Sequence, residues 1–495
     1  MGFHSVVHGE RYVFADLVEL LARAGEEKSG DRMAGLAAYS AAERLAAKQA
    51  LADVRLSEIV ATPLIDDAVT DLIAGVHDAE CFGPLSSLTV GEFRDLVLRP
   101  DFPVRWHSGL AGGITPEVAA AVARIMSDRE LVIAAKPLRT VTRCRSTMGE
   151  TGVFGVHVRL NHPLDDLEGI LLPALDGLMS GRGDAVLEVD TSMESAAQVE
   201  RALRGLGSLV RQLEVPTQTC VLGRLVTQLA AMDAGAPLDL LFSRLGGTES
   251  ANRAFGVDLG LLDAGRRAVL EHHRDRAGDF VGDQVTYFAV GQGSAFPVEA
   301  HHGLDQLTIS ARAYGVARAF DPFLVNSVVG FGGMDHLSDS RQVIRAGLED
   351  HFVGKLLGLP MGCDVFCAGR ADDGRNTGDD LLMLLAAAGC NHAAGVPPGH
   401  PVPRQATGPG QVAGRGVTGI DDAIGVRDLF GLRPAPEFAA WLADRGLASG
   451  HGLPEPAGSP RRAGRLGAPP ERWLVDPVKP MAAFLEDGLD WARLS

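Results

Sequence analysis

The sequence predicts an α/β protein in which a helical N-terminal region precedes a (β/α)8 barrel and a Pro/Gly-rich C-terminal extension follows it. The composition is 46% hydrophobic and 22% charged, which is typical of globular domains. Eight short apolar runs follow one another after residue 130, and amphipathic segments separate most of them. Strands that alternate with helices form a parallel sheet covered on both faces, and eight such strands close a TIM barrel. A doubly wound open sheet is the alternative.

Residues 1–110 are expected to form the helical N-terminal region. The segment 29–54 is the clearest helix, because its apolar residues recur at helical spacing among alanines, and Ser29 or Asp31 is a candidate N-cap. Shorter helices are predicted over 65–73, 92–98 and 115–128. Thr115 is the expected N-cap of the last of these, since a proline follows it at the first helical position.

The barrel is expected over 111–395. Its predicted strands are short runs rich in Val, Leu and Phe, as buried strands are. They cover 130–136, 153–160, 184–190, 217–223, 238–243, 286–291, 322–330 and 361–368. The predicted helices between them cover 196–213, 259–275, 304–320 and 341–358.

The pattern changes after residue 395. Residues 396–420 are dense in Pro and Gly and are interpreted as an insertion without regular structure. A C-terminal helical cap is expected over 421–450, with a helix at 436–446. Residues 451–495 are interpreted as a flexible extension, although its last stretch, 481–494, has the pattern of a short amphipathic helix.

The chain is acidic, with 46 Lys and Arg against 63 Asp and Glu and a net charge of −17. It lacks the excess of cations that nucleic-acid binding needs, and the same sign disfavours adsorption to membrane surfaces. No apolar run approaches the ~18 residues that span a bilayer. The opening MGFHSVVHGERYVFADL has neither the basic nor the apolar region of a signal peptide. We therefore expect a cytoplasmic protein with no nucleic-acid or membrane partner.

Common catalytic and metal-binding motifs are missing from the sequence. Six cysteines in 495 residues make no disulfide framework, and Cys363 and Cys367 lack the second pair or nearby histidine that would complete a zinc set. No metal site is predicted. No G-x-S-x-G or H-E-x-x-H occurs, which leaves a serine hydrolase or a zinc protease unsupported. The histidine-containing stretches are interpreted as structural or solvated; they are 271–273, 301–302 and 350–351.

Functional residues of a barrel gather at the carboxyl ends of its strands. The polar residues expected there are Arg159, Asn161, Asp190, Ser243, Asp364 and the GQGS turn at 291–294. One arginine and two carboxylates that converge in an apolar mouth would form a cage for a small polar substrate. Loop-facing polar residues or ion pairs within the barrel are the alternative. The turn could let a ligand approach the backbone, and a tight strand-to-helix turn explains it equally well.

Six long strings resemble one family in sequence and in order, from about residue 10 to about residue 450. They are SGDRMAGLAAYSAAERLAAKQ (29–49), VPTQTCVLGRLVTQ (215–228), GQGSAF…AHHGLDQ (291–306), DPFLVNSVVGF (321–331), RQVIRAGLEDHFVGKLLGLPMGCD (341–364) and LRPAPEF (432–438). Strings of this length are highly specific, and the chain resembles the large subunit of ethanolamine ammonia-lyase.

The resemblance implies a TIM-barrel subunit that binds adenosylcobalamin together with a separate small subunit, and that associates with further large subunits. Homolysis of the cobalt–carbon bond would give a radical that takes hydrogen from the carbinol carbon of the substrate; the amino group migrates, and ammonia and acetaldehyde are released. No D-x-H-x-x-G occurs, which fits base-on cofactor binding in this family. The implied location is the cytoplasm or a bacterial microcompartment.

The resemblance also implies site residues. Arg159 matches the arginine that holds the substrate hydroxyl, and Asp364 matches the aspartate that contacts the substrate ammonium. Together with Asp190 they form the implied catalytic set. The implied substrate contacts are these three residues with Leu160, Asn161 and Ala289. The implied cofactor contacts are Thr191, Ser243, Pro297 and Pro403.

Several of these positions differ from the family pattern. Asn161 replaces a glutamine, and Asp190 followed by Thr191 replaces an Asn-Pro pair. Ala289 replaces the glutamate that would bind the substrate ammonium. Ser243 and Pro297 replace a glutamine and a serine, and Pro403 falls in the insertion that replaces a methionine-containing loop.

One carboxylate is lost at Ala289 and one is gained at Asp190, so the number of carboxylates in the cage is unchanged. We infer that the anionic wall has moved from one strand to another, which suits an amine held in a rotated pose or a larger amino alcohol above Ala289. Three functions stay open: an ammonia-lyase acting on a small vicinal amino alcohol, an adenosylcobalamin-dependent eliminase or mutase with a different substrate, and a non-catalytic paralogue.

Overall fold

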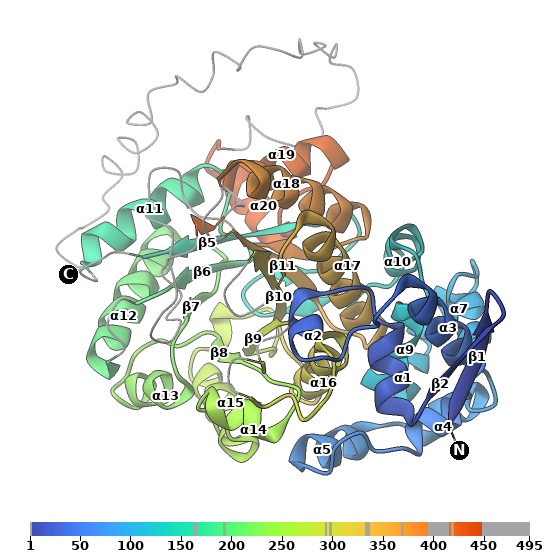
Figure 1. Cartoon of the computed structure of the whole chain (residues 1–495). Coiled ribbons are helices and arrows are strands. Elements are labelled where there is room, and N and C mark those ends of the chain that lie inside the picture. The colour runs from blue at the N-terminus through green and yellow to red at the C-terminus, as the bar shows by residue number, and fades with distance from the viewer. Residues whose placement is uncertain are drawn as a thin grey trace, which may run out of the picture.

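The computed structural model describes residues 2–161, 166–191, 195–292, 295–296, 299–331, 337–367, 371–394, 415–416 and 420–447. The chain forms a parallel barrel with its N-terminal region packed on one side, against α16 (Gln306–Arg318) and α17 (Ser340–Leu356) (Figure 1). The predictions for 396–414, for 451–495 and for its helix at 481–494 lie outside the described residues.

The N-terminal region opens with a β-hairpin, β1 (Phe3–Val7) and β2 (Glu10–Phe14), which the sequence reasoning missed. Its two-residue turn has positive φ at both His8 and Gly9, as a type I′ turn requires. Short helices follow. They are α1 (Leu17–Ala24), α2 (Ser29–Met33), α3 (Ala41–Ala52), α4 (Leu56–Val60), α5 (Ala68–Val76), α6 (Ala79–Phe82), α7 (Val90–Val97), α8 (Phe102–His107), α9 (Pro116–Arg124) and α10 (Asp128–Ala135).

The single helix predicted over 29–54 is wrong, because the chain breaks between α2 and α3. Ser40 caps α3 by accepting a hydrogen bond from the backbone N of Glu43. Ser29 and Asp31 lie inside α2 and cap nothing there; Asp31 instead accepts a hydrogen bond from the backbone N of Gln306 in the barrel. The predicted cap at Thr115 is confirmed.

Eight parallel strands form the barrel. They are β5 (Gly155–Leu160), β6 (Val186–Val189), β7 (Thr219–Val221), β8 (Leu241–Arg244), β9 (Thr286–Gly291), β10 (Leu324–Phe331), β11 (Met361–Cys367) and β12 (His392–Ala393). Their order is β7-β6-β5-β12-β11-β10-β9-β8. Leu240 N donates a 3.2 Å hydrogen bond to Thr219 O, so the two ends of the sheet meet and the barrel is nearly closed. The TIM-like fold is therefore confirmed and the open sheet is not.

Seven of the eight predicted strands are confirmed, and the strand predicted at 130–136 is wrong. That segment is helix α10, which begins at a capping box between Ser127 and Glu130. Leu131, Ala134 and Ala135 are buried at helical spacing. The true eighth strand is β12, and its two residues are too short a run to stand out in the sequence.

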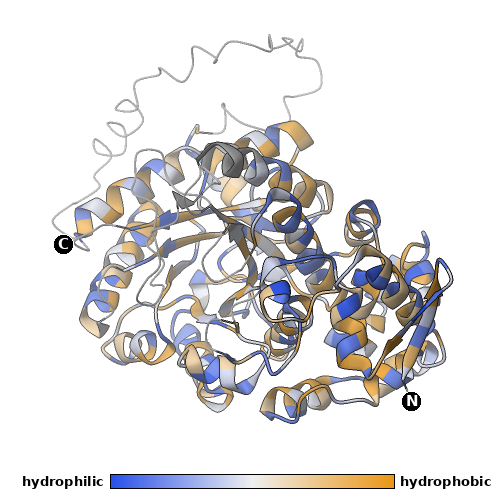
Figure 2. Cartoon of the chain, in the orientation of Figure 1, coloured by the Kyte–Doolittle hydropathy of each residue, from blue (hydrophilic) through white to orange (hydrophobic). Residues whose placement is uncertain are grey.

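Helices surround the barrel, and a small hairpin, β3 (Thr142–Arg143) with β4 (Thr147–Met148), precedes it. The helices are α11 (Leu167–Met179), α12 (Ala196–Leu213), α13 (Leu225–Asp233), α14 (Glu249–Ala254), α15 (Leu259–Arg274), α16 (Gln306–Arg318), α17 (Ser340–Leu356), α18 (Ala371–Ala387), α19 (Ile420–Phe430) and α20 (Pro436–Asp444). The short strand β13 (Arg415–Gly416) pairs with β11. These helices carry both hydrophobic and hydrophilic residues, as helices between a core and solvent do (Figure 2).

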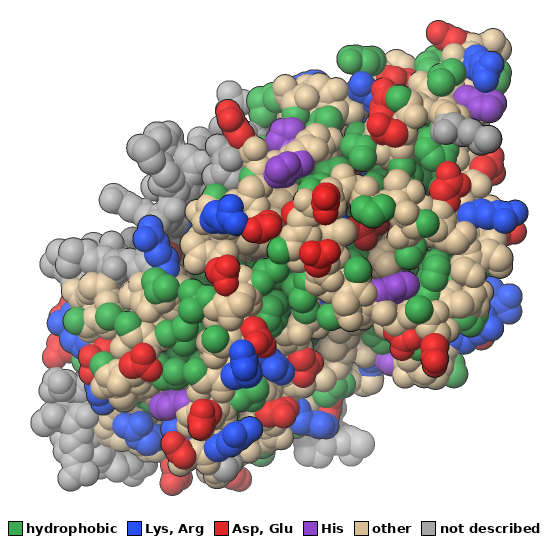
Figure 3. Space-filling view, turned by 90° about the horizontal axis from the view of Figure 1, so that it is seen from below, with side chains coloured by type: hydrophobic (Ala, Val, Ile, Leu, Met, Phe, Trp, Pro, Cys, Tyr) green, Lys and Arg blue, Asp and Glu red, His purple; other side chains and the backbone are tan. Residues whose placement is uncertain are grey.

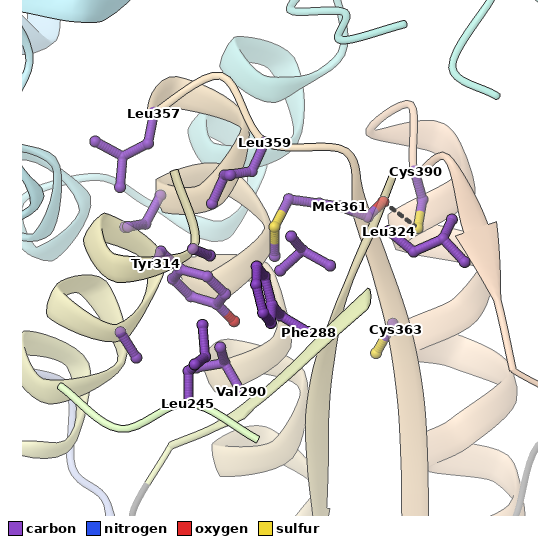
Figure 4. Packing of buried hydrophobic residues seen from close by; sticks show 14 of the residues in the cluster. Leu245, Phe288, Val290, Tyr314, Leu324, Leu357, Leu359, Met361, Cys363 and Cys390 are labelled. Carbon is purple, nitrogen blue, oxygen red and sulfur yellow. Dashed lines mark hydrogen bonds between the residues drawn. The ribbon is translucent and has the colours of Figure 1, made fainter. Parts of the chain in front are cut away.

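Buried apolar residues fill the layer between strands and helices. Figure 4 shows Tyr314 of α16 beside Phe288 of β9, with Met361 of β11 close by. Since side chains of a strand alternate between its two faces, the neighbours of such outward residues point into the barrel. On β10, for example, Ser327 donates to Asp350 of α17 and so points outward, which places Asn326 inside.

No helix among the described residues is both long and apolar enough to cross a membrane.

Candidate active site

A buried cluster of three charged residues lies inside the barrel. Arg159 of β5 donates from Nε to Glu188 Oε1 of β6 at 2.6 Å, and from Nη1 to Asp364 Oδ2 of β11. Arg159 is 5% exposed, Asp364 3% and Glu188 0%. The strands β5 and β11 are separated only by β12, so the barrel brings together an arginine and an aspartate 205 positions apart. The predicted pairing of Arg159 with Asp364 in one site is thus found in the structure.

The two carboxylates of this cluster have opposite pKa shifts. Burial would raise the pKa of Glu188, but the charge of Arg159 and the neighbouring His157 outweigh it and lower that pKa to about 2. Burial raises the pKa of Asp364, and the like charge of Glu188 adds to the rise against the opposing effect of Arg159. Glu188 is therefore the permanently charged partner of Arg159, and Asp364 is the carboxylate that takes up a proton first as pH falls.

Two histidines extend the cluster away from Asp364. His157 Nδ1 lies 3.5 Å from Glu188 Oε2, and its Nε2 is 2.8 Å from His392 Nδ1. Both histidines are 0% exposed. Burial and the neighbouring His157 hold the pKa of His392 well below its usual range, so His392 is neutral at neutral pH. Tyr287 of β9 packs edge-on against the His157 ring, with 5.6 Å between ring centroids.

Half-exposed residues surround the opening at the carboxyl ends of the strands. They are Asn161, Asp190, Arg244, Ala289, Gly291 and Val328. Asp190 follows β6, and its backbone N bonds to Leu160 O at 2.9 Å, which places the carboxylate beside the end of β5. Asn161 Oδ1 is buried and accepts no hydrogen bond from the residues that the structure describes. The mouth thus presents polar groups to a ligand.

Ala289 lies between two polar residues on neighbouring strands. It is in register with Arg244 of β8 and with Asn326 of β10. Asn326 is 1% exposed, and neither atom of its side-chain amide finds a hydrogen-bond partner within the described part of the chain. A buried, unpaired amide is costly, on the order of 1–3 kcal/mol, and is uncommon in folded proteins.

Other predicted site residues lie less close to the cluster. Leu160 is 1% exposed and alternates with the inward Arg159, so its side chain faces the helices. Ser243 is 3% exposed, donates to the carbonyl of Arg244, and alternates with the inward Phe242. Thr191 is half-buried just beyond Asp190. Pro297 and Pro403 lie outside the described residues, and all five assignments stay predictions.

The GQGS turn is only partly described. Gln292 donates from Nε2 to Asp350 Oδ1 at 2.9 Å and to Ala346 O at 3.1 Å, both on α17. Its side chain is therefore anchored to a helix on the outer side of the barrel. Gly293 and Ser294 are outside the described residues.

The histidine-containing stretches have structural surroundings. His302 Nε2 lies 2.8 Å from Ser250 Oγ, and His301 stacks on Phe296 with 4.5 Å between centroids. His351 is buried in α17, next to Asp350. The expectation that 271–273 is solvated is wrong for His273, which is 6% exposed because it stacks on Phe280 at 3.8 Å.

The cysteines also have no role in metal binding that the structure reveals. Five described cysteines are free thiols, namely Cys81, Cys144, Cys220, Cys363 and Cys390. Within the described ranges, no group of three His, Cys, Asp or Glu side chains could hold a metal ion.

Sequence reasoning missed Glu188, Arg244 and Asn326. Glu188 left one signal, as the acid that interrupts the apolar residues between Asp184 and Asp190, and such a residue needs a buried partner. Arg244 and Asn326 lie beside Ala289 only through the register of β8 and β10 with β9, which the sequence does not reveal. Over one face of the molecule acidic and basic side chains are interspersed, without a continuous basic area (Figure 3).

The chain matches the family model "Ethanolamine ammonia lyase large subunit (EutB)" over residues 12–456. It is 38% identical over 463 residues to the ethanolamine ammonia-lyase large subunit of Escherichia coli strain K12, covering 93% of this chain and 99% of that protein. The large subunit from Salmonella typhimurium strain LT2 gives the same identity and coverage. Matches of this extent include the barrel and its N-terminal region together. The chain therefore belongs to the ethanolamine ammonia-lyase large subunit family, whose members are cobalamin-dependent radical lyases.

Proposed function

We propose that this chain is the catalytic large subunit of an adenosylcobalamin-dependent ammonia-lyase that converts a small vicinal amino alcohol, with ethanolamine as the first candidate, to an aldehyde and ammonia. The observation that carries this proposal is the contact between Arg159 and Asp364 at the bottom of the barrel mouth. An arginine and a carboxylate held side by side can bind a hydroxyl and an ammonium on adjacent carbons.

Arg159 supplies the donors for the substrate hydroxyl. A guanidinium stays charged at every relevant pH and presents five N–H donors in a planar fork. Asp364 supplies the acceptor for the ammonium. Its Oδ2 accepts from Arg159, and no described residue donates to Oδ1. With both ends of the substrate fixed, the carbinol carbon between them is held in one orientation toward the mouth.

Asp190 replaces the carboxylate that Ala289 does not provide. It lies half-exposed at the rim of the mouth, directly after β6, the strand next to β5. The cluster of Arg159, Glu188 and Asp364 has a net charge of −1, Asp190 adds a second negative charge, and Arg244 at the opening offsets one of them. An anionic cage of this kind favours a cationic amine by direct attraction. We infer that Asp190 is part of the ammonium-binding wall.

Adenosylcobalamin, the cofactor of the family, supplies when bound the carbon-centred radical that removes a hydrogen atom from the substrate. The mouth fits such a group, since half-exposed polar and small residues line it and Asn161 Oδ1 offers an unmatched acceptor. Thr191, Ser243, Pro297 and Pro403 are the residues proposed to hold it in base-on form. The protein's own part is to bind and orient the substrate and to keep water from it.

The printed name of the relatives, a large subunit, implies a small subunit as partner. We propose that this chain binds such a subunit and that large subunits associate with each other. A cytoplasmic or microcompartment location follows from the same resemblance.

A second candidate function is an adenosylcobalamin-dependent eliminase or mutase of the same fold acting on a different small substrate. Ala289 favours it, because its small, half-exposed side chain leaves room next to the unpaired amide of Asn326. A substituent on the carbon skeleton could occupy that room and bond to the amide.

Turnover of amino alcohols of increasing size tests the proposal. The complex with a family small subunit and adenosylcobalamin is assayed for ammonia release from ethanolamine and from analogues with one methyl or hydroxymethyl group more. Ammonia release from ethanolamine or from an analogue supports the first function, and the highest kcat/KM identifies the preferred substrate. Turnover without ammonia release supports the second. No turnover with any of these amino alcohols, in a complex whose optical spectrum shows bound cofactor, contradicts the first function.

The double variant Ala289→Glu with Asp190→Asn tests the displaced carboxylate, with Ala289→Glu alone as its control. If Asp190 binds the ammonium, the double variant places the carboxylate on the wrong side and ethanolamine turnover falls. A strong rise in turnover would show that the native mouth is built for another substrate.

A further inference from the structure

Arg159 is the residue on which the proposed substrate contacts depend, and two buried carboxylates bind its guanidinium. Glu188 lies directly opposite Arg159 in the β5–β6 register, and its Oε1 accepts from Arg159 Nε at 2.6 Å. Asp364 accepts from Nη1. Arg159 is thus fixed by two carboxylates from two different strands, one on each side of β5.

Two histidines lie behind Glu188. Its second oxygen, Oε2, is 3.5 Å from His157 Nδ1, and neither atom has a hydrogen-bond partner among the described residues; His157 Nε2 lies 2.8 Å from His392 Nδ1. A carboxylate can only accept, so it favours the His157 tautomer that has hydrogen on Nδ1. Nε2 is then an acceptor, and His392 must donate to it from Nδ1. The two rings are also nearly parallel, with 4.6 Å between centroids.

A row of five polar side chains therefore crosses the barrel interior, from His392 on β12 through His157, Glu188 and Arg159 to Asp364 on β11. Hydrogen bonds join all neighbours in the row except His157 and Glu188, which lie 3.5 Å apart. All five side chains are 5% exposed or less. If one of its two carboxylate acceptors were removed, the buried guanidinium of Arg159 would lose its fixed orientation. A displacement of ~1 Å at a substrate-binding group can lower the rate about 100-fold.

We propose that Glu188 is the positioning residue of the active site: backed by the His157–His392 pair, it fixes the guanidinium of Arg159 in the orientation that binds the substrate hydroxyl. The inference rests on the proposed function for the identity of the substrate, and on geometry alone for the position of Arg159. Glu188 does not itself contact the substrate.

The test compares three variants. Glu188→Asp keeps the charge and withdraws the carboxylate by one methylene. Glu188→Gln keeps the length and an acceptor oxygen and removes the charge. Glu349→Gln is the matched control. Glu349 is also 0% exposed, forms ion pairs with two cations (Lys28 at 2.8 Å and Arg345 at 2.7 Å) and has its pKa lowered to about 2, but it lies on α17 outside the barrel interior.

The first readout is ethanolamine affinity, by titration calorimetry on the large subunit and by KM in the reconstituted complex. Glu188→Asp is expected to weaken binding roughly 10- to 100-fold, as misplacement of a binding group does. Glu349→Gln is expected to leave Kd and KM within twofold of the wild type, whatever it costs in thermal stability. Equal Kd and KM in Glu188→Asp, Glu188→Gln and wild type would overturn the proposal.

The second readout is the pH profile, which a purely structural role would not change. The negative charge of Glu188 raises the pKa of Asp364, so Glu188→Gln is expected to shift the acid limb of kcat/KM to lower pH. Glu188→Asp keeps the charge and should leave the limb in place. A limb that moves equally in Glu349→Gln would contradict the assignment.

The third readout separates this proposal from the proposed function. If the wild type binds no amino alcohol, a crystal structure of Glu188→Asp still decides the matter. A guanidinium displaced from its wild-type place supports positioning by Glu188 even though the substrate is wrong. A guanidinium that keeps its place against Asp364 overturns the positioning role whatever the substrate is.

Discussion

Arg159 and Glu188 lie opposite each other on neighbouring parallel strands, and a 2.6 Å hydrogen bond joins Nε of the one to Oε1 of the other inside the barrel. A charge pair in this position is expensive to bury and contributes little to stability compared with apolar packing. Its value lies in orientation: Glu188 stays ionised, with its pKa at about 2, and so holds Arg159 beside Asp364 over the whole useful pH range. Four predictions follow from the surroundings of this pair and from the contacts that keep the barrel intact.

Substrate affinity is expected to fall on acidification because of Asp364. Its pKa is raised, chiefly by burial, so it accepts a proton at higher pH than an exposed aspartate, and the neutral acid no longer attracts an ammonium. KM for the amino alcohol should therefore rise as pH falls through that pKa, while Glu188 stays charged. Asp364→Asn should have a high KM that does not rise further as the pH falls. If KM of Asp364→Asn still rises on acidification as it does in the wild type, a group other than Asp364 is responsible for the pH dependence.

Asn326→Leu is expected to leave the fold as stable as the wild type or to stabilise it by up to about 2 kcal/mol. The substitution removes an amide whose two polar atoms are buried without a partner among the described residues. Ser327→Val is the control on the next residue, because it removes the 2.9 Å bond to Asp350 and should destabilise by about 1–3 kcal/mol. Urea unfolding measures both. A loss in Asn326→Leu as large as in Ser327→Val would show that the amide has a stabilising contact.

Asp184→Ala is expected to destabilise the protein by about 3–5 kcal/mol, as the loss of one partner from a buried ion pair does. Asp184 is 0% exposed and accepts from Arg427 of α19 at 2.6 Å, from Val156 N and from Ala435 N. It thus fastens the C-terminal helices to the barrel. The exposed Asp176 on α11 provides the control, Asp176→Ala, with a change below ~0.5 kcal/mol. Equal melting temperatures for the two variants would contradict this role.

Gly354→Ala should destabilise the barrel wall by about 1–3 kcal/mol through overpacking. A Cβ at this position in α17 would collide with the side chain of Met361 on β11, which lies against the helix in a fully packed layer. Gly425 of α19 is also helical, and a Cβ there meets nothing within 4 Å. Gly425→Ala is therefore expected to be neutral or slightly stabilising. Thermal unfolding that ranks the two variants the other way would show that α17 can move away from β11.

The barrel could be predicted from the sequence because seven of its strands are continuous apolar runs between amphipathic helices. The failures have local causes. The segment 130–136 has an apolar core of strand length, and only the Ser127–Glu130 capping box shows that it is a helix. The strand β12 has two residues and is defined by its neighbours on both sides.

The candidate site could be predicted only in part. Arg159 and Asp364 are polar residues in or at the ends of apolar runs, so their place at the mouth follows from the fold class. The side chains of Glu188 and Asn326 also point into the barrel. Their importance depends on neighbouring strands, because Glu188 bonds to Arg159 on β5 and Asn326 finds no hydrogen-bond partner among the described residues. Strand register fixes such contacts, and register depends on packing across the whole barrel.

The most direct test of the account is electron paramagnetic resonance on the complex reconstituted with a family small subunit, adenosylcobalamin and ethanolamine. A radical lyase that binds its substrate through Arg159 and Asp364 should give a paramagnetic signal that requires substrate and is lost or strongly reduced in Asp364→Asn. The contradicting result is the absence of any substrate-dependent signal from the wild type, with ethanolamine and with the larger amino alcohols, in a sample whose optical spectrum shows bound cofactor.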